Sequence, residues 1–156
     1  MSNYIQVTFG TPSVLKRIMA KHPERKLYLY KSTSQRDFQL VDFSNRKSVF
    51  NSPIKYQILE SKINNCRKNF INYQFMNLNR KQIKVLRSWL KLTEQNSQSV
   101  RMNQIYWLTS SDHLWQIILT GWDQNSSYKK WKHDFRLKFN KLDPSNSFYE
   151  RDYYLL

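Results

Sequence analysis

Few side chains in this sequence stand at spacings that would support catalysis. Ser110, Asp112 and His113 are the residue types of a nucleophilic triad, but they lie almost side by side in a predicted hairpin and cannot form that geometry. His22, His113 and His133 lie near predicted helix ends or turns, so we expect them to face solvent rather than a metal ion. The sequence has no glycine-rich phosphate loop, no HExxH motif and no CxxC motif.

A basic stripe on a predicted helix is the second candidate functional feature. Lys84, Arg87 and Lys91 recur at helical spacing, with Arg80 and Lys81 close by, opposite an apolar stripe. Two interpretations stay open: a solvated helix face, or a surface that contacts the phosphates of a nucleic acid.

The charge balance of the chain favours anionic partners. Its 156 residues include 26 Lys+Arg against 11 Asp+Glu, a formal net charge of +15, and the excess is spread over both halves instead of forming a tail. Such a surface attracts nucleic acid or anionic lipid, or it is simply a solvated basic surface.

The single cysteine, Cys66, excludes an internal disulfide, and no metal site is predicted. The N-terminal residues lack the basic and apolar regions of a signal peptide. The longest apolar runs, such as Ile105–Leu108, are too short to cross a bilayer. We therefore expect a cytoplasmic protein without a membrane span.

Strand and helix patterns follow the same order twice along the chain. In the first half, Thr11 caps a helix that Pro12 opens and His22-Pro23 stops. The strands expected around that helix are 3–9, 27–31, 38–43 and 54–59. In the second half we expect strands at 69–78, 102–109, 114–122 and 148–155, and helices at 79–92 and 126–139.

These two β-α-β-β patterns predict an α+β protein of two ferredoxin-like halves, residues 1–62 and 63–156. The short polar joint at Ile63–Cys66 indicates that the halves pack against each other and do not swing freely. We expect their sheets to pack face to face into an α/β barrel, which would bury the aromatic residues that make up 15% of the chain.

Several short segments, in matching order, resemble one protein family. The segments similar to the N-terminal part of TRAP (target of RNAIII-activating protein) and of the related HmoB-type heme monooxygenases are Tyr4–Thr11, Lys21–Pro23 and Ser48–Pro53. Ile118–Trp122, followed by Tyr128 and Trp131, resembles the ILTxW segment of HmoB and IsdG, and Ser147–Arg151 resembles the C-terminal segment of TRAP. The family belongs to the antibiotic-biosynthesis-monooxygenase-like (ABM-like) superfamily, whose fold is a ferredoxin-like unit paired into an α/β barrel.

The resemblance to IsdG-type enzymes implies a heme held between helix and sheet by an axial His, distorted by a Trp, with an Asn near the bound oxygen. Trp122 stands at the position of that Trp, and Gln74 stands near that of the Asn. Lys141 stands where the axial His is expected, so Lys138 and Lys141 are candidates to pair with heme propionates. A protonated lysine does not ligate ferric heme, so the sequence does not favour oxidative heme cleavage.

The leading hypothesis is an ABM-like protein that binds heme or a similar flat apolar ligand between the last helix and the sheet, with Trp122 at the pocket floor. Heme degradation is the activity expected if the protein is an enzyme. The alternatives are a non-catalytic regulatory or stress-related protein on the same fold, as the resemblance to TRAP implies, and a nucleic-acid-binding protein. A monomer and a homodimer both stay open.

Overall fold

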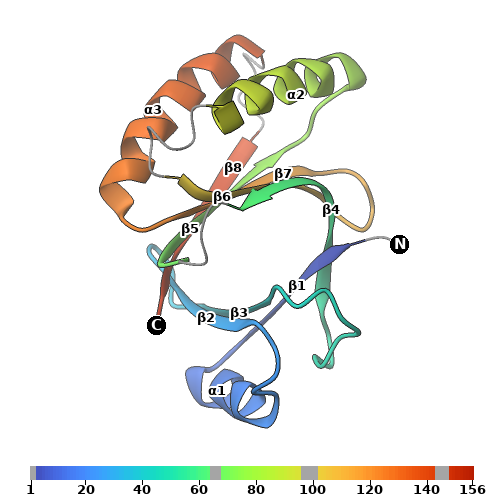
Figure 1. Cartoon of the computed structure of the whole chain (residues 1–156), viewed down its shortest axis with the longest axis vertical. Helices are drawn as coiled ribbons and strands as arrows, with labels where there is room; N and C mark the ends of the chain where they lie inside the picture. Colours follow the sequence, from blue (N-terminus) through green and yellow to red (C-terminus); the bar gives the residue numbers. More distant parts are fainter. Residues whose placement is uncertain (1–2, 64–67, 96–101, 143–147) are drawn as a thin grey trace.

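A single closed barrel of antiparallel strands is the centre of the structure, a computed structural model that describes residues 3–63, 68–95, 102–142 and 148–156. The strands in these ranges are β1 (Tyr4–Gly10), β2 (Leu27–Ser32), β3 (Phe38–Asp42), β4 (Ile54–Ile63), β5 (Phe70–Met76), β6 (Met102–Thr109), β7 (Gln116–Trp122) and β8 (Phe148–Leu155). The helices are α1 (Pro12–Lys21), α2 (Arg80–Gln95) and α3 (Asn125–Leu142). In Figure 1, α2 and α3 lie together on one side of the barrel, and α1 lies on the opposite side. Within the described ranges, no helix is long and apolar enough to span a bilayer.

Capping residues determine where the first two helices begin. The Val14 N–H donates to Thr11 Oγ1 at 3.4 Å, and Pro12 occupies the first helical position, as the sequence predicts. At the start of α2, the Gln82 N–H donates to Asn79 Oδ1 at 2.9 Å and the Asn79 N–H donates to Gln82 Oε1 at 2.9 Å. This reciprocal capping box satisfies two backbone donors that the helix itself leaves unpaired.

The two halves of the chain meet edge to edge, which corrects the expectation that their sheets pack face to face. The strand order around the barrel is β1-β3-β2-β8-β5-β7-β6-β4, so β2–β8 and β4–β6 are the pairs that join the halves. Each pairing removes a sheet edge whose N–H and C=O groups would otherwise be unpaired. β4 runs on to Ile63, beyond the predicted end, because a bulge between Ile58 and Glu60 lets it stay paired with β6.

The α+β class and the α/β barrel predicted from the sequence are confirmed. The division at residue 63 into two units stays a prediction. Cys66, in the predicted joint, lies outside the described residues.

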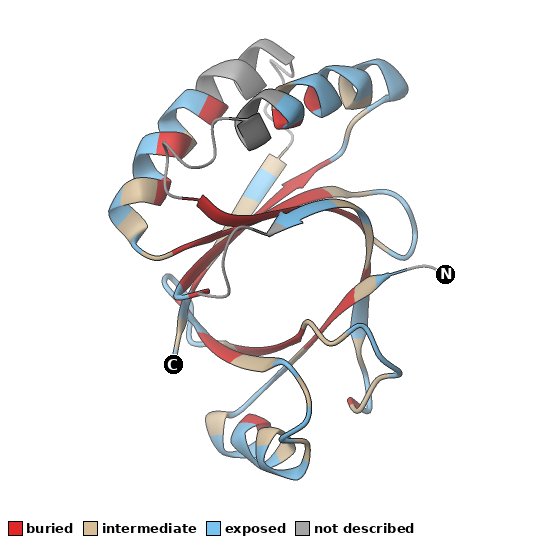
Figure 2. Cartoon of the chain, viewed as in Figure 1, coloured by how far each residue is buried: buried red, intermediate tan, exposed pale blue. Residues whose placement is uncertain are grey.

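The barrel wall separates two apolar clusters. Alternate residues of β5, namely Ile71, Tyr73 and Phe75, lie in the barrel interior, whereas Phe70 and Met76 face α2 and α3. Every residue of β5 and β6 is buried, and Figure 2 shows this as continuous red on the strands beneath the two helices. A third cluster, formed by Leu15, Leu29, Leu40 and Phe50, holds α1 on the other side. The barrel interior and the layer between the outer wall and α2 and α3 are therefore two separate environments.

Gly121, in β7, is a position where a side chain does not fit. A Cβ built there would lie 2.5 Å from Gln104 Cγ and 2.7 Å from Gln104 Nε2, closer than packed atoms approach. Gln104 is fully buried, so its side chain has no solvent to move into. We expect Gly121→Ala to lower the free energy of unfolding by about 1–3 kcal/mol, measured by urea denaturation.

Gly10→Ala is the matched control, because a Cβ at Gly10 lies 3.4 Å from Leu15 Cδ2, an ordinary contact. It should change stability by no more than about 0.5 kcal/mol. Equal losses in the two variants would contradict the steric explanation.

Candidate functional site

Trp122 lies at the end of β7 and faces the helices, not the barrel interior. Its indole N–H donates to Thr120 Oγ1 at 2.9 Å, and the side chain is fully buried. The rings of Tyr128 and Trp131, from α3, pack against it with centroid separations of 5.9 Å and 5.6 Å. Trp122 therefore lies on the predicted face of the sheet, but α3 covers it.

Aromatic rings continue this packing along α3. Trp131 stacks on Phe135 with centroids 4.9 Å apart and planes 19° apart, and Tyr128 contacts Phe70 of β5 at 5.0 Å. The helical spacing of Tyr128, Trp131 and Phe135 puts all three on the face of α3 that meets the sheet. A flat ligand in contact with Trp122 would have to displace these rings.

Gln74 lies beside Asn72 on the side of β5 that faces the helices, because side chains alternate along a strand. Both side chains are fully buried. Gln74 Nε2 donates to Asn72 Oδ1 at 2.9 Å and to Glu150 Oε2 at 2.8 Å. Gln74 Oε1 has no hydrogen-bond partner among the described residues, so this amide carries one unsatisfied acceptor there.

Glu150, from β8, is the centre of this polar network. Its carboxylate accepts hydrogen bonds from the Tyr128 hydroxyl at 2.8 Å and from Asn72 Nδ2 at 3.4 Å, besides the one from Gln74. Lys132 of α3 forms an ion pair with the same carboxylate. Burial raises the pKa of Glu150, but the hydrogen bonds from Lys132, Tyr128 and Gln74 outweigh burial and hold the pKa below its ordinary value.

Sequence reasoning missed Glu150 and Lys132 as site residues. Lys132 follows Tyr128 by four positions, which places both on one helix face and was the available signal. The alternation of β8 puts Glu150 and Asp152 on the side opposite Tyr153, but only the register with β5 brings Glu150 opposite Gln74.

The remaining residues that the sequence singles out either lie outside the described side chains or lie away from this network. Lys138 and Lys141 fall in the last turns of α3, where the side chains lie outside the described part of the structure. His133 and His113 are exposed, and His22 Nδ1 lies 3.6 Å from Glu24 Oε1. No cluster of His, Cys, Asp and Glu among the described residues could hold a metal ion.

The described residues do not fit a heme held between α3 and the sheet. The side chains of α3 that face Trp122 and Gln74 are aromatic rings and Lys132, and none of these described groups is an imidazole. A lysine ammonium has no free electron pair to give to iron. The half-buried carboxylate of Glu150 would also oppose an apolar macrocycle with acidic side chains.

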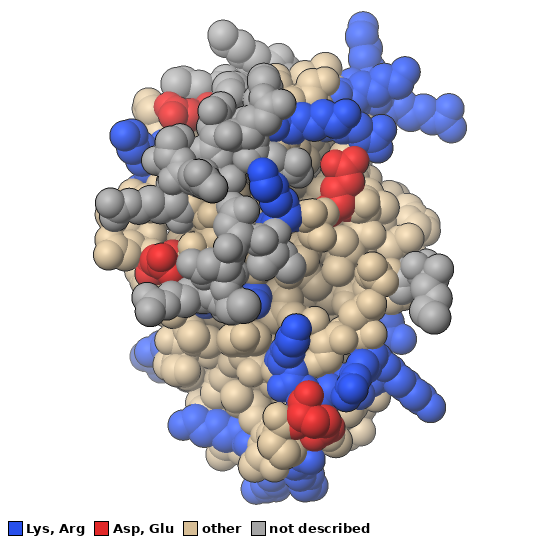
Figure 3. All heavy atoms as spheres, viewed as in Figure 1, with Lys and Arg blue, Asp and Glu red and all other residues tan. Residues whose placement is uncertain are grey.

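Most of the described Lys and Arg side chains face outward, and a smaller number form contacts within the chain. Figure 3 shows Lys and Arg spread around the visible face with few Asp and Glu among them. On α2, Arg87 of the predicted basic stripe lies 3.6 Å from Glu60 and stacks over Trp107 at 5.1 Å. The other four cations of the stripe, Arg80, Lys81, Lys84 and Lys91, are exposed.

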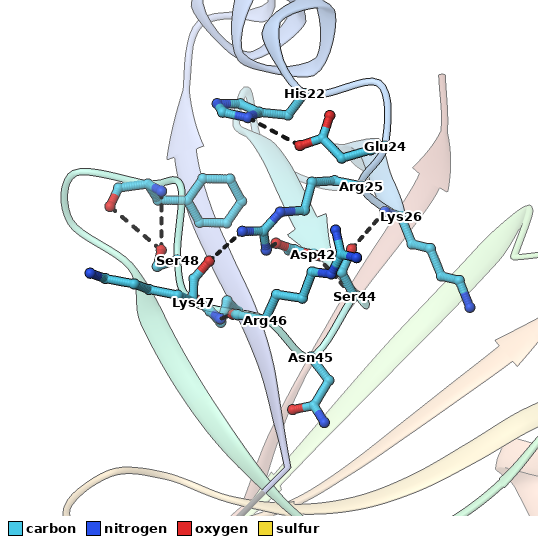
Figure 4. Close-up of polar contacts among 12 residues, drawn as sticks. His22, Glu24, Arg25, Lys26, Asp42, Ser44, Asn45, Arg46, Lys47 and Ser48 are labelled. Atoms are coloured by element: carbon cyan, nitrogen blue, oxygen red, sulfur yellow. Dashed lines mark hydrogen bonds and ion pairs between the residues drawn. The ribbon is translucent and has the colours of Figure 1, made fainter.

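Arg25 lies in the loop between α1 and β2 and contacts the end of β3 and the loop that follows β3. Its guanidinium forms a 3.1 Å ion pair with the buried Asp42 and donates to the carbonyl of Lys47 (Figure 4). Asp42 also accepts from the Ser44 N–H at 2.8 Å. In Figure 4 the side chains of Lys26 and Lys47 extend away from this network. The contacts of Arg25 are therefore structural.

Loss of the ammonium partner should destabilise the fold. We expect Lys132→Ala to lower the free energy of unfolding by about 1–3 kcal/mol at neutral pH, because it leaves the half-buried Glu150 carboxylate without a cation. Lys130→Ala removes the same charge from the exposed side of α3 and should cost no more than about 0.5 kcal/mol. Similar losses in the two variants, measured by urea denaturation, would contradict the role assigned to Lys132.

The same network predicts a pH dependence. Because the folded pKa of Glu150 lies below its ordinary value of 4.5, its contribution is complete above that value and is lost as pH falls through the folded pKa. Between about pH 6 and pH 3, the wild type should therefore lose more stability than Glu150→Gln. Parallel stability curves for the two proteins would refute this assignment.

The fold is shared with solved structures. No family model and no curated protein matches the chain. An uncharacterized ferredoxin-fold protein related to antibiotic biosynthesis monooxygenases, from Listeria monocytogenes, matches with a TM-score of 0.82 and 15% identity, over 100% of this chain and 96% of the other.

Two further structures match over almost their full length. A major regulator of staphylococcal pathogenesis has a TM-score of 0.80 and 16% identity, with 98% of this chain and 99% of the other covered. A heme-degrading enzyme from Listeria monocytogenes has a TM-score of 0.74 and 16% identity, with 97% and 98% covered. At these identities the likeness establishes the fold alone. The chain therefore has the ferredoxin-like α/β-barrel fold of the proteins related to antibiotic biosynthesis monooxygenases, as its sequence predicts.

Proposed function

We propose that this chain acts by binding, as a non-catalytic regulatory protein on the ABM-like fold, and that it does not cleave heme. The observation that supports this most strongly is the Lys132–Glu150 ion pair beside Trp122. The Tyr128 hydroxyl donates to Glu150 while the Tyr128 ring packs on Trp122, so the pair helps to hold α3 over this part of the sheet. Stable burial of this pair needs the hydrogen bonds from Gln74 and Tyr128, and these also tie α3 to β5 and β8.

The residues around Trp122 favour regulation over heme degradation. Among the solved structures with this fold are a regulator and a heme-degrading enzyme, so the fold itself permits either function. Heme cleavage needs a ligand for the iron and space for the macrocycle. Against Glu150, the described part of α3 offers the ammonium of Lys132, and it fills the space over the sheet with Trp131 and Phe135. The leading hypothesis from the sequence was that the protein binds heme. This would also require space that Trp131 and Phe135 fill.

Nucleic-acid binding receives less support than a regulatory binding function. The cations that face outward are distributed over the surface, and Arg25 and Arg87 are engaged in internal ion pairs. A distributed charge attracts anions without selecting among them. The cytoplasmic location and the choice between monomer and homodimer stay predictions.

Titration with hemin tests the proposal. We expect no Soret shift when hemin is added at micromolar concentration to the purified protein, because the ion pair and the rings of α3 cover Trp122. With ascorbate or a reductase present, no biliverdin-like product should form. A known heme-binding protein serves as the positive control.

A Soret shift together with such a product would overturn the proposal. A shift without product would retain a non-catalytic protein but would show that the aromatic packing on Trp122 opens for heme.

A further inference from the structure

One end of the barrel interior holds a pocket that is separate from the site at Trp122. Its volume is about 200 Å³, and its lining includes Tyr56, Tyr73 and Phe75 together with Asp37 and Arg151. A cavity of about 150 Å³ accepts benzene, whereas drug-sized ligands need roughly 300 Å³ or more. The pocket therefore has the size for a compound with one aromatic ring.

A buried cation lies before β5, toward the opposite end of that strand from Phe75. Lys68, which precedes β5, is only 6% exposed and places Nζ 4.8 Å from the ring centre of Tyr28 and 4.7 Å from that of Phe43. Such cation–π contacts hold a desolvated ammonium in place. Phe75 lies near the other end of β5, so a ligand reaches the pocket from that end.

Protonated phenols form much of the pocket wall. Burial raises the pKa of Tyr56 to about 12, and burial raises the pKa of Tyr73 and Tyr153 as well. All three hydroxyls therefore keep their protons at neutral pH and can donate hydrogen bonds, either within the chain or to a ligand. The Tyr73 hydroxyl donates to Gln39 Oε1 at 3.0 Å. The hydroxyls of Tyr56 and Tyr153 make no hydrogen bond in the described part of the chain, which leaves two donors for a ligand.

The pocket also presents one group of each charge. Arg151 bonds the carbonyl of Glu150 at 3.2 Å through one nitrogen and lies over the Tyr149 ring at 5.3 Å, so the rest of its guanidinium can meet an anion. Asp37 Oδ1 is buried and accepts no hydrogen bond from any described residue. A buried carboxylate oxygen without a donor raises the free energy of the folded protein. A hydrogen-bond donor on a ligand would remove that penalty.

Flat aromatic faces complete the wall. Phe75 and Tyr149 stack with ring centroids 4.6 Å apart and planes 9° apart. The ring centroid of Tyr56 lies 6.4 Å from that of Phe75. Rings in this arrangement accept another ring by stacking or by edge contact.

We propose that this pocket binds a small aromatic acid that carries a hydroxyl or amino group. The carboxylate pairs with Arg151 and accepts from the Tyr56 and Tyr153 hydroxyls, the ring lies against Phe75, and the hydroxyl or amino group donates to Asp37. This inference goes beyond the proposed function, because it concerns the inner face of the barrel wall and not the outer face at Trp122. The hemin result therefore does not decide it.

Calorimetric titration with 4-hydroxybenzoate is the test, with benzoate as the matched probe that lacks the hydroxyl. We expect saturable binding of one 4-hydroxybenzoate per chain with a Kd below about 1 mM, and weaker binding of benzoate. Arg151→Gln should weaken 4-hydroxybenzoate binding about tenfold or more, through loss of a charge-assisted contact. Asp37→Asn should reduce the preference for 4-hydroxybenzoate over benzoate.

Arg36→Gln is the control, because Arg36 is exposed and does not line the pocket. It should leave the affinity unchanged. Tyr56→Phe removes one hydroxyl without changing the ring, so it tests the site even if Arg151→Gln fails to fold, and it should weaken binding severalfold. Absence of saturable binding up to about 10 mM, or equal affinity in wild type and the folded pocket variants, would overturn the proposal.

Discussion

The pairing of β2 with β8 and of β4 with β6 is the constraint on which the rest of the structure depends. Without these two pairings, each half would be an open sheet with two unpaired edges and one face of aromatic side chains in water. With them, the backbone hydrogen bonds run continuously around the barrel. The apolar faces of both halves then form one interior.

Closure of the barrel also separates the chemistry of the chain into two environments. Because side chains alternate along a strand, β8 places Glu150 outside, against α3, and places Arg151 and Tyr153 inside. Glu150 belongs to a network of hydrogen bonds in which, among the described residues, Gln74 Oε1 is left without a donor. The Arg151 guanidinium and the Tyr153 hydroxyl line the inner pocket and can still donate hydrogen bonds to a ligand. A satisfied network stabilises the fold, whereas unsatisfied groups beside a cavity provide a place for a ligand.

Local patterns in the sequence predict most elements of this fold. Thr11 caps α1 as expected, because capping depends on residues within one turn. The contact between Glu150 and Gln74 could not be predicted in this way, because it joins residues far apart in the chain and depends on the register of β5 with β8. The bulge in β4 was missed for the same reason, since its partner strand β6 determines it.

We propose that α3 covers Trp122 through packed rings and the Lys132–Glu150 pair, so that the outer site does not take up a heme. The most direct measurement is an amide NMR spectrum of the protein with and without ferric hemin, whose paramagnetic iron broadens nearby resonances. If α3 covers Trp122, the amide resonances of Trp122, Trp131 and Lys132 should keep their linewidths when hemin is added. Selective broadening of these three resonances would contradict it.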